Sequence, residues 1–307
     1  MSDRVALITY ARNSIARGSK SFAMASKLFD GKTRERVWLL YAWCRKCDDM
    51  ADGQDHGGYM AQVTDPAERL AAIRILTAKA LRGEATGEPA FDCLGLVARE
   101  CGLTQQMADA VIDGFALDAD DWRPGTENDL YRYCFHVAGA VGVMMAVVMG
   151  VDAQDDAVFD RACDLGLAFQ LANIARDVAE DAAAGRCYLP QDWLAAAGID
   201  ETSLMAPAHR AALTTIIKRL CDASERYEAS AKVGATQLPF RARWAVLSAA
   251  GIYGDIAREV RGRGAASLDA RVYTGKAAKL AWVAKAFGQA VRNNPVMTGR
   301  DGLWTRG

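Results

Sequence analysis

The sequence has little of the pattern that forms β-strands, and it contains only three histidines. Long alternating runs of Val, Ile, Thr and aromatic residues are absent, whereas helical periodicity recurs along almost the whole chain. Lys and Arg total 37 against 38 Asp and Glu, which gives a net charge of −1 and no basic stripe. We therefore expect an all-α protein that does not bind nucleic acid.

The sequence also lacks a hydrophobic run of membrane-spanning length. Its longest apolar run covers residues 137–151, whereas a spanning helix needs about 20 apolar residues. We expect a buried core helix there. The N-terminal residues show no signal or transit character. The eight cysteines are scattered through apolar helical contexts, as in a reduced cytosolic protein. The one closely spaced pair, Cys44 and Cys47, has no second pair or spaced histidines to complete a zinc site.

Helix start and stop signals divide the chain into a series of predicted helices. Asp65 and Pro66 read as an N-cap followed by proline at the first helical position, and Thr126 and Asp129 have capping-box spacing. No linker is long or low enough in complexity to split the chain, so residues 1–307 are predicted to form one domain. The predicted helices cover residues 4–16, 20–29, 33–53, 66–82, 89–101, 104–119, 127–150, 155–184, 190–196, 208–233, 240–261 and 275–292.

Two acidic segments, far apart in the chain, each repeat an aspartate at positions i and i+4 of a predicted helix. At about 100° per residue, these two positions share one face of a helix. The aspartates are Asp48 and Asp52 in the first segment, and Asp177 and Asp181 in the second. The same faces also carry Tyr41 and Arg45 in the first helix, and Gln170 and Asn173 in the second.

A metal site explains the two acidic faces better than a solvated helix surface does. A single Asp-x-x-x-Asp pair on a helix is most often a solvated face. Here there are two, and both fall in the interior or C-terminal part of a predicted helix, where the helix dipole disfavours acids. Carboxylates on apolar helices are costly unless they meet a cation. Magnesium prefers hard oxygen ligands, usually one or two carboxylates together with substrate phosphates. The two faces therefore indicate a site for a diphosphate bridged by metal.

Several longer stretches resemble the squalene/phytoene synthase family, the head-to-head isoprenyl diphosphate synthases. The resemblance covers nearly the whole chain, and its specificity comes from the stretches taken together. It implies a single-domain isoprenoid synthase fold, a helical bundle around a central cavity. The stretches are residues 19–23 (SKSFA), 41–45 (YAWCR) leading into Asp48, 133–142 (YCFHVAGAVG), 165–181 (LGLAFQLANIARDVAED) and 186–190 (RCYLP).

Within the family, the pattern is most similar to the bacterial phytoene-forming enzymes. This similarity implies a prenyltransferase of carotenoid and isoprenoid biosynthesis that joins two molecules of geranylgeranyl diphosphate. One diphosphate ionises, and the allylic cation alkylates the second molecule to give a cyclopropylcarbinyl (prephytoene) diphosphate. That intermediate ionises, rearranges and loses a proton, so the products are phytoene and two diphosphates.

The acidic faces and the resemblance together assign expected roles to individual residues. Mg²⁺ or Mn²⁺ is the expected cofactor, and no nicotinamide is expected. Asp49 and Glu180 lie off the two faces and are expected in supporting or solvated positions. The expected metal ligands are Asp48, Asp52, Asn173, Asp177 and Asp181. The expected catalytic residues are Tyr41, Arg45, Tyr133, Gln170, Tyr188 and Tyr253. The expected substrate-binding residues are Ser19, Lys20, Ser21, Phe22, Arg45, Ala138, Ala146, Arg186 and Arg271.

Alternative functions stay open at this point. Dehydrosqualene or squalene synthesis would use farnesyl diphosphate. Squalene formation also needs a nicotinamide reductant, and no Gly-x-Gly-x-x-Gly follows a strand here. A non-catalytic scaffold relative should have lost part of its acidic segments, whereas both are intact. The small residues around Ala138 and Ala146 fit either close helix packing or room for a prenyl tail.

The nature of the expected reaction also predicts where the protein works. An amphiphilic substrate and a hydrocarbon product favour a cytoplasmic protein that associates weakly and peripherally with the inner face of the membrane. The net charge offers no polybasic anchor, so we expect binding through an exposed apolar rim. Other enzymes of carotenoid synthesis are further candidate partners.

Overall fold

The fold is described from a computed structural model. The structure describes residues 3–52, 54–55, 58–59, 65–119, 122–152 and 154–306. Contacts between Cα atoms divide the chain into two compact units: Met1–Asp120 with Val143–Asp155, and Asp121–Gly142 with Asp156–Gly307. Helices make up both units, and the prediction of an all-α protein is confirmed.

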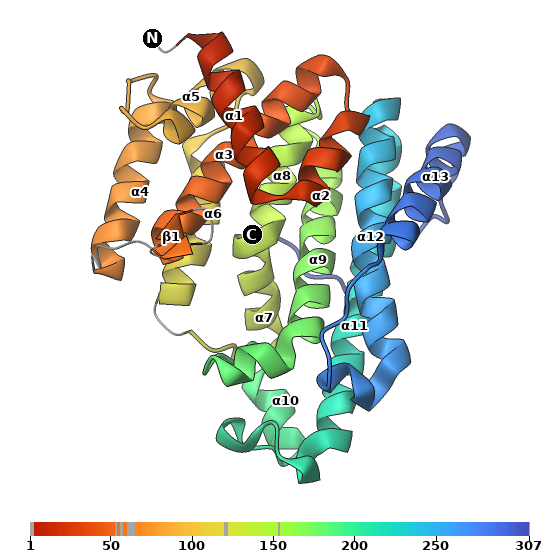
Figure 1. Cartoon of the computed structure of the whole chain (residues 1–307). Coiled ribbons are helices and arrows are strands. Elements are labelled where there is room, and N and C mark those ends of the chain that lie inside the picture. Colours follow the sequence, from red (N-terminus) through yellow and green to blue (C-terminus); the bar gives the residue numbers. More distant parts are fainter. Residues whose placement is uncertain are drawn as a thin grey trace. The chain divides into compact units, whose positions relative to one another are not determined.

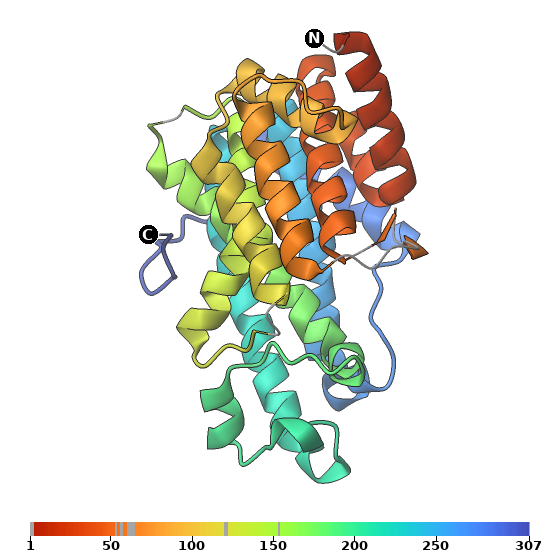
Figure 2. The ribbon, with the colours of Figure 1, turned by 90° about the vertical axis from the view of Figure 1, so that its left-hand side faces the viewer.

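The first unit contains the N-terminal helices. Figure 2 shows α4 and α6 side by side within it. β1 and β2 pair as a minimal antiparallel ladder, the local exception to the helical structure of the described residues. The elements are α1 (Arg4–Gly18), α2 (Lys20–Ala25), the 3-10 turn η1 (Ser26–Leu28), α3 (Gly31–Asp52), β1 (Gln54–Asp55), β2 (Gly58–Tyr59), α4 (Pro66–Leu81), α5 (Pro89–Cys101), α6 (Gln105–Ala119) and the greater part of α8 (Ala140–Val148).

The core of the first unit forms where α3, α4 and α5 pack together. Trp43 is fully buried, and its indole N–H donates to the Thr77 hydroxyl at 3.2 Å, so its one polar atom is satisfied. Gly95 lets α5 approach α4 closely, because an added Cβ would lie 2.6 Å from the Ala80 carbonyl oxygen. Asp65 caps α4 by accepting from the Ala67 N–H at 3.1 Å, as predicted.

The second unit contains the long helices of the C-terminal half. Figure 1 shows α9, α11 and α12 running alongside one another, with α13 against α12. The elements are α7 (Glu127–Cys134), the π-helical turn η2 (Phe135–Gly139), α9 (Asp156–Ala183), α10 (Gln191–Ala196), the 3-10 turns η3 (Glu201–Ser203), η4 (Pro207–His209), η5 (Ala235–Gln237) and η6 (Gly264–Leu268), and the helices α11 (Arg210–Gly234), α12 (Phe240–Arg263) and α13 (Lys276–Arg292).

Small residues bring η2 and the start of α8 close to α9. An added Cβ at Gly142 would lie 2.5 Å from the Ala162 carbonyl oxygen, and one at Gly166 would lie 2.5 Å from that of Ala138. Close helix packing thus explains these glycines. The predicted capping box at Thr126 is present, with the Asp129 side chain accepting from the Thr126 N–H.

The sequence predicts one helix over residues 127–150, and the structure has a helical run over Glu127–Val148. The π-helical turn η2 lies inside this run and was not predicted, and an extra residue in a turn re-aims the side chains on either side. By length and composition alone, Glu127–Val148 could cross a membrane, although 56% of its most apolar window is buried. Met144 and Ala146 are at most 1% exposed, which agrees with the predicted core helix.

Ion pairs and hydrogen bonds hold the C-terminal segment against α9. Asp164 is completely buried, and Arg300 donates to both its oxygens at 2.9 Å. Ser230 of α11 adds a hydroxyl at 2.5 Å. Arg300 also reaches Asp160 at 2.9 Å, and the Trp304 N–H donates to the Tyr227 hydroxyl at 3.0 Å. A buried carboxylate is tolerable here because three donors satisfy it.

The cysteines behave as small hydrophobic residues. All eight are free, and six of them are buried. Burial raises the pKa of the Cys44 thiol to about 12 and that of Cys47 well above its ordinary value. A thiol with a raised pKa forms little thiolate near neutral pH, so the Cys44–Cys47 pair is suited to packing and not to metal or redox chemistry.

Candidate active site

The first acidic segment forms an ion-paired cluster on α3. Arg45 donates to the Asp48 carboxylate at 3.0 Å and lies 2.6 Å from that of Asp49. The Asp49 side chain is 5% exposed, whereas that of Asp48 is 47% exposed. Asp49 therefore holds Arg45 from the buried side and is not solvated, while Asp48 keeps an accessible carboxylate. Arg45 is fixed in place by both, as a residue that binds phosphate oxygens should be.

Tyr41 lies one turn before Arg45 and is covered by the N-terminal helices. An added Cβ at Gly18 would fall 2.4 Å from the Tyr41 hydroxyl oxygen, so only glycine leaves room for this ring. The Phe22 ring lies 6.2 Å from that of Tyr41, centroid to centroid. Ser19 caps α2 by accepting from the Phe22 N–H at 3.2 Å. Burial raises the pKa of Tyr41, so its hydroxyl stays protonated and able to donate.

The second acidic segment lies near the C-terminal end of α9 and gathers two arginines. Arg176 donates to both oxygens of Asp177, at 2.6 and 2.5 Å. Arg271, from the segment between η6 and α13, donates to the same carboxylate at 3.0 Å and lies 3.5 Å from Glu180. The Asp177 side chain is 18% exposed and that of Glu180 is 50% exposed. Arg176 was not expected as a site residue, although it lies within the segment that carries the resemblance.

Asp181 lies one helical turn after Asp177 in a partly buried position. Burial, with the nearby Asp177 charge, raises the pKa of Asp181 from 3.8 to about 6, although Arg186 opposes the shift. Asp181 and Arg186 also line one small cavity together with Tyr188. Two carboxylates one turn apart, one of them reluctant to ionise, form an arrangement that a bound cation would stabilise.

Aromatic side chains form two stacks in the second unit. Tyr133 lies between Trp122 and Tyr188, with ring centroids 5.4 and 5.0 Å away and nearly parallel planes. Tyr253 stacks on Phe169 at 4.2 Å. Three of these five residues, the tyrosines, were expected from the sequence. Trp122 and Phe169 were not, because nothing in the sequence relates a loop tryptophan to a tyrosine in α7. Their rings fix the orientation of the three tyrosines.

The structure says less about the roles of the other expected residues. Gln170 and Asn173 are partly exposed on α9, and no hydrogen-bond partner is found for either within the described part of the chain. Ala138 is partly buried in η2 next to Gly166, and Ala146 is buried in α8. The side chains of Lys20, Ser21 and Asp52 lie outside the described residues.

The expected metal ligands come from both units. Asp48 and Asp52 belong to the first unit, and Asn173, Asp177 and Asp181 belong to the second. Across the residues that the structure describes, no three His, Cys, Asp or Glu side chains are grouped closely enough to hold a metal ion. The metal site stays a prediction, supported in each unit by the chemistry of oxygen donors beside fixed arginines.

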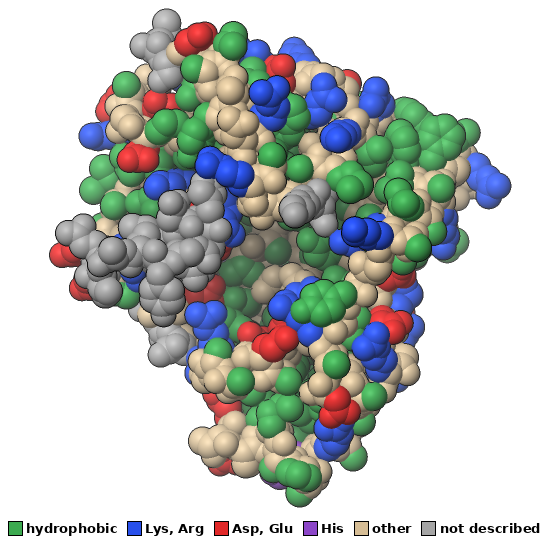
Figure 3. Space-filling view, in the orientation of Figure 1, with side chains coloured by type: hydrophobic (Ala, Val, Ile, Leu, Met, Phe, Trp, Pro, Cys, Tyr) green, Lys and Arg blue, Asp and Glu red, His purple; other side chains and the backbone are tan. Residues whose placement is uncertain are grey.

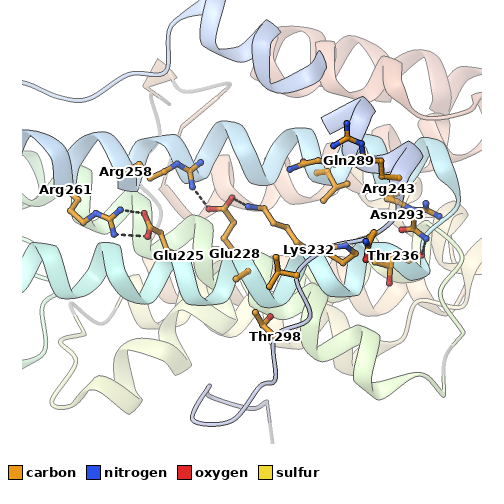
Figure 4. A pocket seen from close by; sticks show the side chains of 16 residues that line it. Glu225, Glu228, Lys232, Thr236, Arg243, Arg258, Arg261, Gln289, Asn293 and Thr298 are labelled. Carbon is orange, nitrogen blue, oxygen red and sulfur yellow. Dashed lines mark hydrogen bonds and ion pairs between the residues drawn. The ribbon is translucent and has the colours of Figure 1, made fainter. Parts of the chain in front are cut away.

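One cavity among the described residues lies away from both acidic segments. It has a volume of about 620 Å³ and lies in the second unit among α11, α12, the end of α13 and residues 294–298. Figure 4 shows Glu228 between Lys232 and Arg258, with which it forms ion pairs of 2.6 and 2.7 Å, and Glu225 paired with Arg261. Its carboxylates are thus already neutralised, and they offer no free ligands to a metal.

The chain belongs to the squalene/phytoene synthase family, whose model matches residues 15–278. It is therefore an enzyme of the prenyltransferase type. The phytoene synthase of Pseudescherichia vulneris is 46% identical to it, and the alignment covers 98% of each chain. The 15-cis-phytoene synthase of Pantoea ananas is 45% identical over 93% of this chain and 92% of the relative. That of a Paracoccus species is 46% identical over 100% of this chain and 99% of the relative.

Comparison with solved structures establishes the isoprenoid synthase fold. A dehydrosqualene synthase in complex with a ligand has a TM-score of 0.82 and 24% identity, covering 94% of this chain and 98% of that chain. The squalene synthase HpnC from Alicyclobacillus acidocaldarius has a TM-score of 0.76 and 22% identity, covering 84% and 94%. At these identities the likeness concerns the fold and leaves the substrate to other arguments.

Proposed function

We propose that this chain is a phytoene-forming prenyltransferase that condenses two molecules of geranylgeranyl diphosphate head to head, by way of a cyclopropylcarbinyl diphosphate. The observation that carries the proposal is identity of 45–46%, over 93–100% of the chain, to bacterial enzymes named phytoene synthases. Both acidic segments are intact, which argues against the non-catalytic scaffold alternative.

A divalent cation, Mg²⁺ or Mn²⁺, is proposed to be held by Asp48, Asp52, Asn173, Asp177 and Asp181. The fit is chemical, because all five offer hard oxygen donors. Burial and the nearby Asp177 charge raise the pKa of Asp181, and a bound cation would offset this cost of ionising Asp181. When bound, such a cation supplies Lewis acidity that makes diphosphate a better leaving group.

The arginines are proposed to bind the diphosphate oxygens. Arg45 is held by Asp48 and Asp49, and Arg271 is held by Asp177. Each guanidinium thus has its orientation set by carboxylates before substrate arrives, which lowers the entropic cost of binding. Arg186, beside Asp181, is a third donor of the same kind.

The aromatic stacks are proposed to face the allylic cations. Tyr188 and Tyr253 are each held by a ring stacked on one face, that of Tyr133 and that of Phe169. Tyr133 is stacked on both faces and therefore positions Tyr188. An aromatic face attracts a cation without attacking it, whereas water would quench it to an alcohol. The tyrosine hydroxyls supply hydrogen bonds to the departing diphosphate, and the raised pKa of Tyr253 keeps that hydroxyl protonated.

The choice of substrate separates this proposal from dehydrosqualene or squalene synthesis. The test is kcat/KM for geranylgeranyl and farnesyl diphosphates, measured with magnesium and with or without NADPH. We expect preference for the C20 substrate and no effect of NADPH. Ala146→Phe tests whether this buried position adjoins a prenyl tail: a shift towards farnesyl diphosphate supports that role, whereas an equal loss with both substrates indicates packing alone.

We further propose that the protein works in the cytoplasm and associates peripherally with the inner face of the membrane. The reason is chemical, since the substrate is an amphiphile and the product a hydrocarbon. Peripheral binding predicts release from membranes by carbonate, and retention after carbonate extraction would contradict it.

A further inference from the structure

Helix α13 is strongly positive in a chain that is nearly neutral. Residues 276–292 contain four cations, Lys276, Lys279, Lys285 and Arg292, and no Asp or Glu, whereas the whole chain has a net charge of −1. The neutral total therefore conceals a local basic surface. Packing against α12 does not explain these cations, because charged side chains contribute little to an apolar contact between two helices.

The outward face of α13 is apolar. Leu280, Phe287 and Val291 are 64%, 46% and 60% exposed, and their spacing of seven and four residues places them on one stripe. Ala286 and Ala290, on another face of the same helix, are buried. Trp282 lies against Gly251 of α12 on the inward side. The helix thus packs inward with Trp282 and the two alanines, and it still leaves Leu280, Phe287 and Val291 largely exposed.

The cations border this stripe on both sides. At about 100° per residue, Lys276 and Lys279 fall on one side, roughly 40° and 100° from the centre of the stripe. Arg292 and Lys285 fall on the other side, roughly 120° and 140° from it. The Lys285 ammonium lies over the Trp282 ring at 4.1 Å, so its alkyl chain runs along the helix surface. Long cationic side chains that flank an apolar stripe are the arrangement of helices lying in a membrane interface.

A neighbouring residue extends the stripe into a patch. Phe240 of α12 packs edge-to-face on Phe287 at 5.7 Å and is 39% exposed. Figure 3 shows hydrophobic side chains gathered over α13 at the upper right, beside Lys and Arg side chains. We call these residues the α13 patch: Phe240, Leu280, Phe287 and Val291.

We propose that the α13 patch is the surface through which this protein binds an anionic lipid bilayer. The apolar side chains would enter the boundary between headgroups and acyl chains, and the cations would meet the lipid phosphates. The cavity beside the C-terminal end of α13 adds to the positive field, because its lining includes five cations, Arg292 among them, against two glutamates. This inference rests on the proposed membrane association and assigns it to one face.

Charge distinguishes a bilayer from a second copy of the chain. Two copies meeting through the α13 patch would bring two helices of four cations each together with no acid between them. Such like-charge contact opposes association. Anionic headgroups supply the opposite charge, and we therefore commit to the membrane.

Sedimentation with lipid vesicles tests the assignment. The purified full chain should bind vesicles of phosphatidylglycerol and phosphatidylcholine, bind pure phosphatidylcholine far more weakly, and lose binding in high salt. Lys276→Glu/Lys285→Glu should weaken partitioning roughly tenfold or more, given the energy of each cation near an anionic surface. Leu280→Asn/Val291→Asn should weaken it by a similar factor, because both exposed side chains would no longer enter the bilayer.

Matched controls lie on exposed positions of the first unit. Lys32→Glu/Lys79→Glu makes the same change in net charge, and Ile75→Asn replaces an apolar residue that is 57% exposed. Both controls should bind like the wild type. Every variant should keep its melting temperature and its turnover in detergent micelles, since no residue changed here belongs to the candidate site.

The possible outcomes test two claims separately: that the protein binds membranes, and that it does so through the α13 patch. Failure of the wild-type chain to bind any vesicle would remove the proposed membrane association itself. Wild-type binding that the α13 variants retain in full would overturn the patch assignment and leave membrane association standing. Equal binding to neutral and anionic vesicles would overturn the charge argument. A dimer that these variants convert to monomer, with no change in vesicle binding, would identify a second copy as the occupant.

Discussion

Arg271 donates a hydrogen bond to the carboxylate of Asp177 at 3.0 Å, although 94 residues separate the two in the sequence. The contact joins the segment after η6 to the second acidic segment of α9. It also places Arg271 within 3.5 Å of Glu180. A cation from outside the helix is thus held against Asp177, an expected metal ligand, where it is also available to diphosphate oxygens.

Replacing Arg271 should impair catalysis and leave the fold intact. Arg271→Gln removes a charge-assisted hydrogen bond, a contact worth about 1.5–3 kcal/mol, so kcat/KM should fall roughly 10- to 100-fold. The melting temperature should hardly change, because exposed ion pairs contribute about 0–1 kcal/mol. Arg263→Gln is the matched control, since Arg263 pairs with Glu259 on the exposed part of α12. Equal kinetics for the two variants would remove Arg271 from the site.

Asp48 and Asp49 should respond differently to the same substitution. Asp48→Asn removes a proposed metal ligand with an accessible carboxylate, so turnover should fall by orders of magnitude at unchanged stability. Asp49→Asn removes the buried negative charge that pairs with Arg45, and it should lower the unfolding free energy by roughly 1–3 kcal/mol. Thermal melting and steady-state kinetics measure both effects. Glu180→Gln, at a 50% exposed side chain, should be mild in both assays.

The raised pKa of Asp181 predicts a specific pH dependence of stability. Its folded-state pKa, about 6, lies above the ordinary value of 3.8. The protonated carboxyl therefore favours folding below pH 4, and this contribution is lost as the pH rises through about 6. Asp181→Asn should remove that loss and stabilise the protein at pH 8 by up to about 2 kcal/mol after solvent screening. Urea unfolding in EDTA at pH 4.5 and pH 8 measures it, and an equal effect at both values would contradict the pKa shift.

The Asp164–Arg300 pair should carry much of the attachment of the C-terminal segment. Arg300→Met leaves a completely buried carboxylate with only the Ser230 hydroxyl, and breaking a buried pair costs about 3–5 kcal/mol. Arg300→Met/Asp164→Leu should recover part of that loss, because no charge is then stranded. Arg82→Gln breaks an exposed pair with Glu84 and should cost little. A loss below 1 kcal/mol in Arg300→Met would show that the segment is held by other contacts.

The helices could be predicted from the sequence because residues at the helix ends determine where each helix begins. Asp65 with Pro66 and Thr126 with Asp129 mark helix starts, and the structure begins α4 and α7 there. The π-helical turn at Phe135–Gly139 could not be predicted, because it depends on how η2 packs against α9. Spacing alone does not encode that contact.

The candidate site could be predicted only in part. The i, i+4 spacing predicted Asp48, Asp177 and Asp181 as metal ligands. The need for cations to bind the phosphates added Arg271, whose contact with Asp177 the structure contains. Burial was the missing information for Asp49, which lies off the acidic face yet anchors Arg45. The Trp122–Tyr133 stack was missed for a related reason, because it depends on tertiary contact between a loop and a helix.

Product analysis with purified protein and geranylgeranyl diphosphate tests the central claim most directly. With magnesium or manganese and without NADPH, mass spectrometry and absorbance should identify phytoene, with two diphosphates released for each molecule formed. EDTA should abolish turnover, and added metal should restore it. Full activity in EDTA, or a C30 hydrocarbon from farnesyl diphosphate with no phytoene from the C20 substrate, would contradict the account.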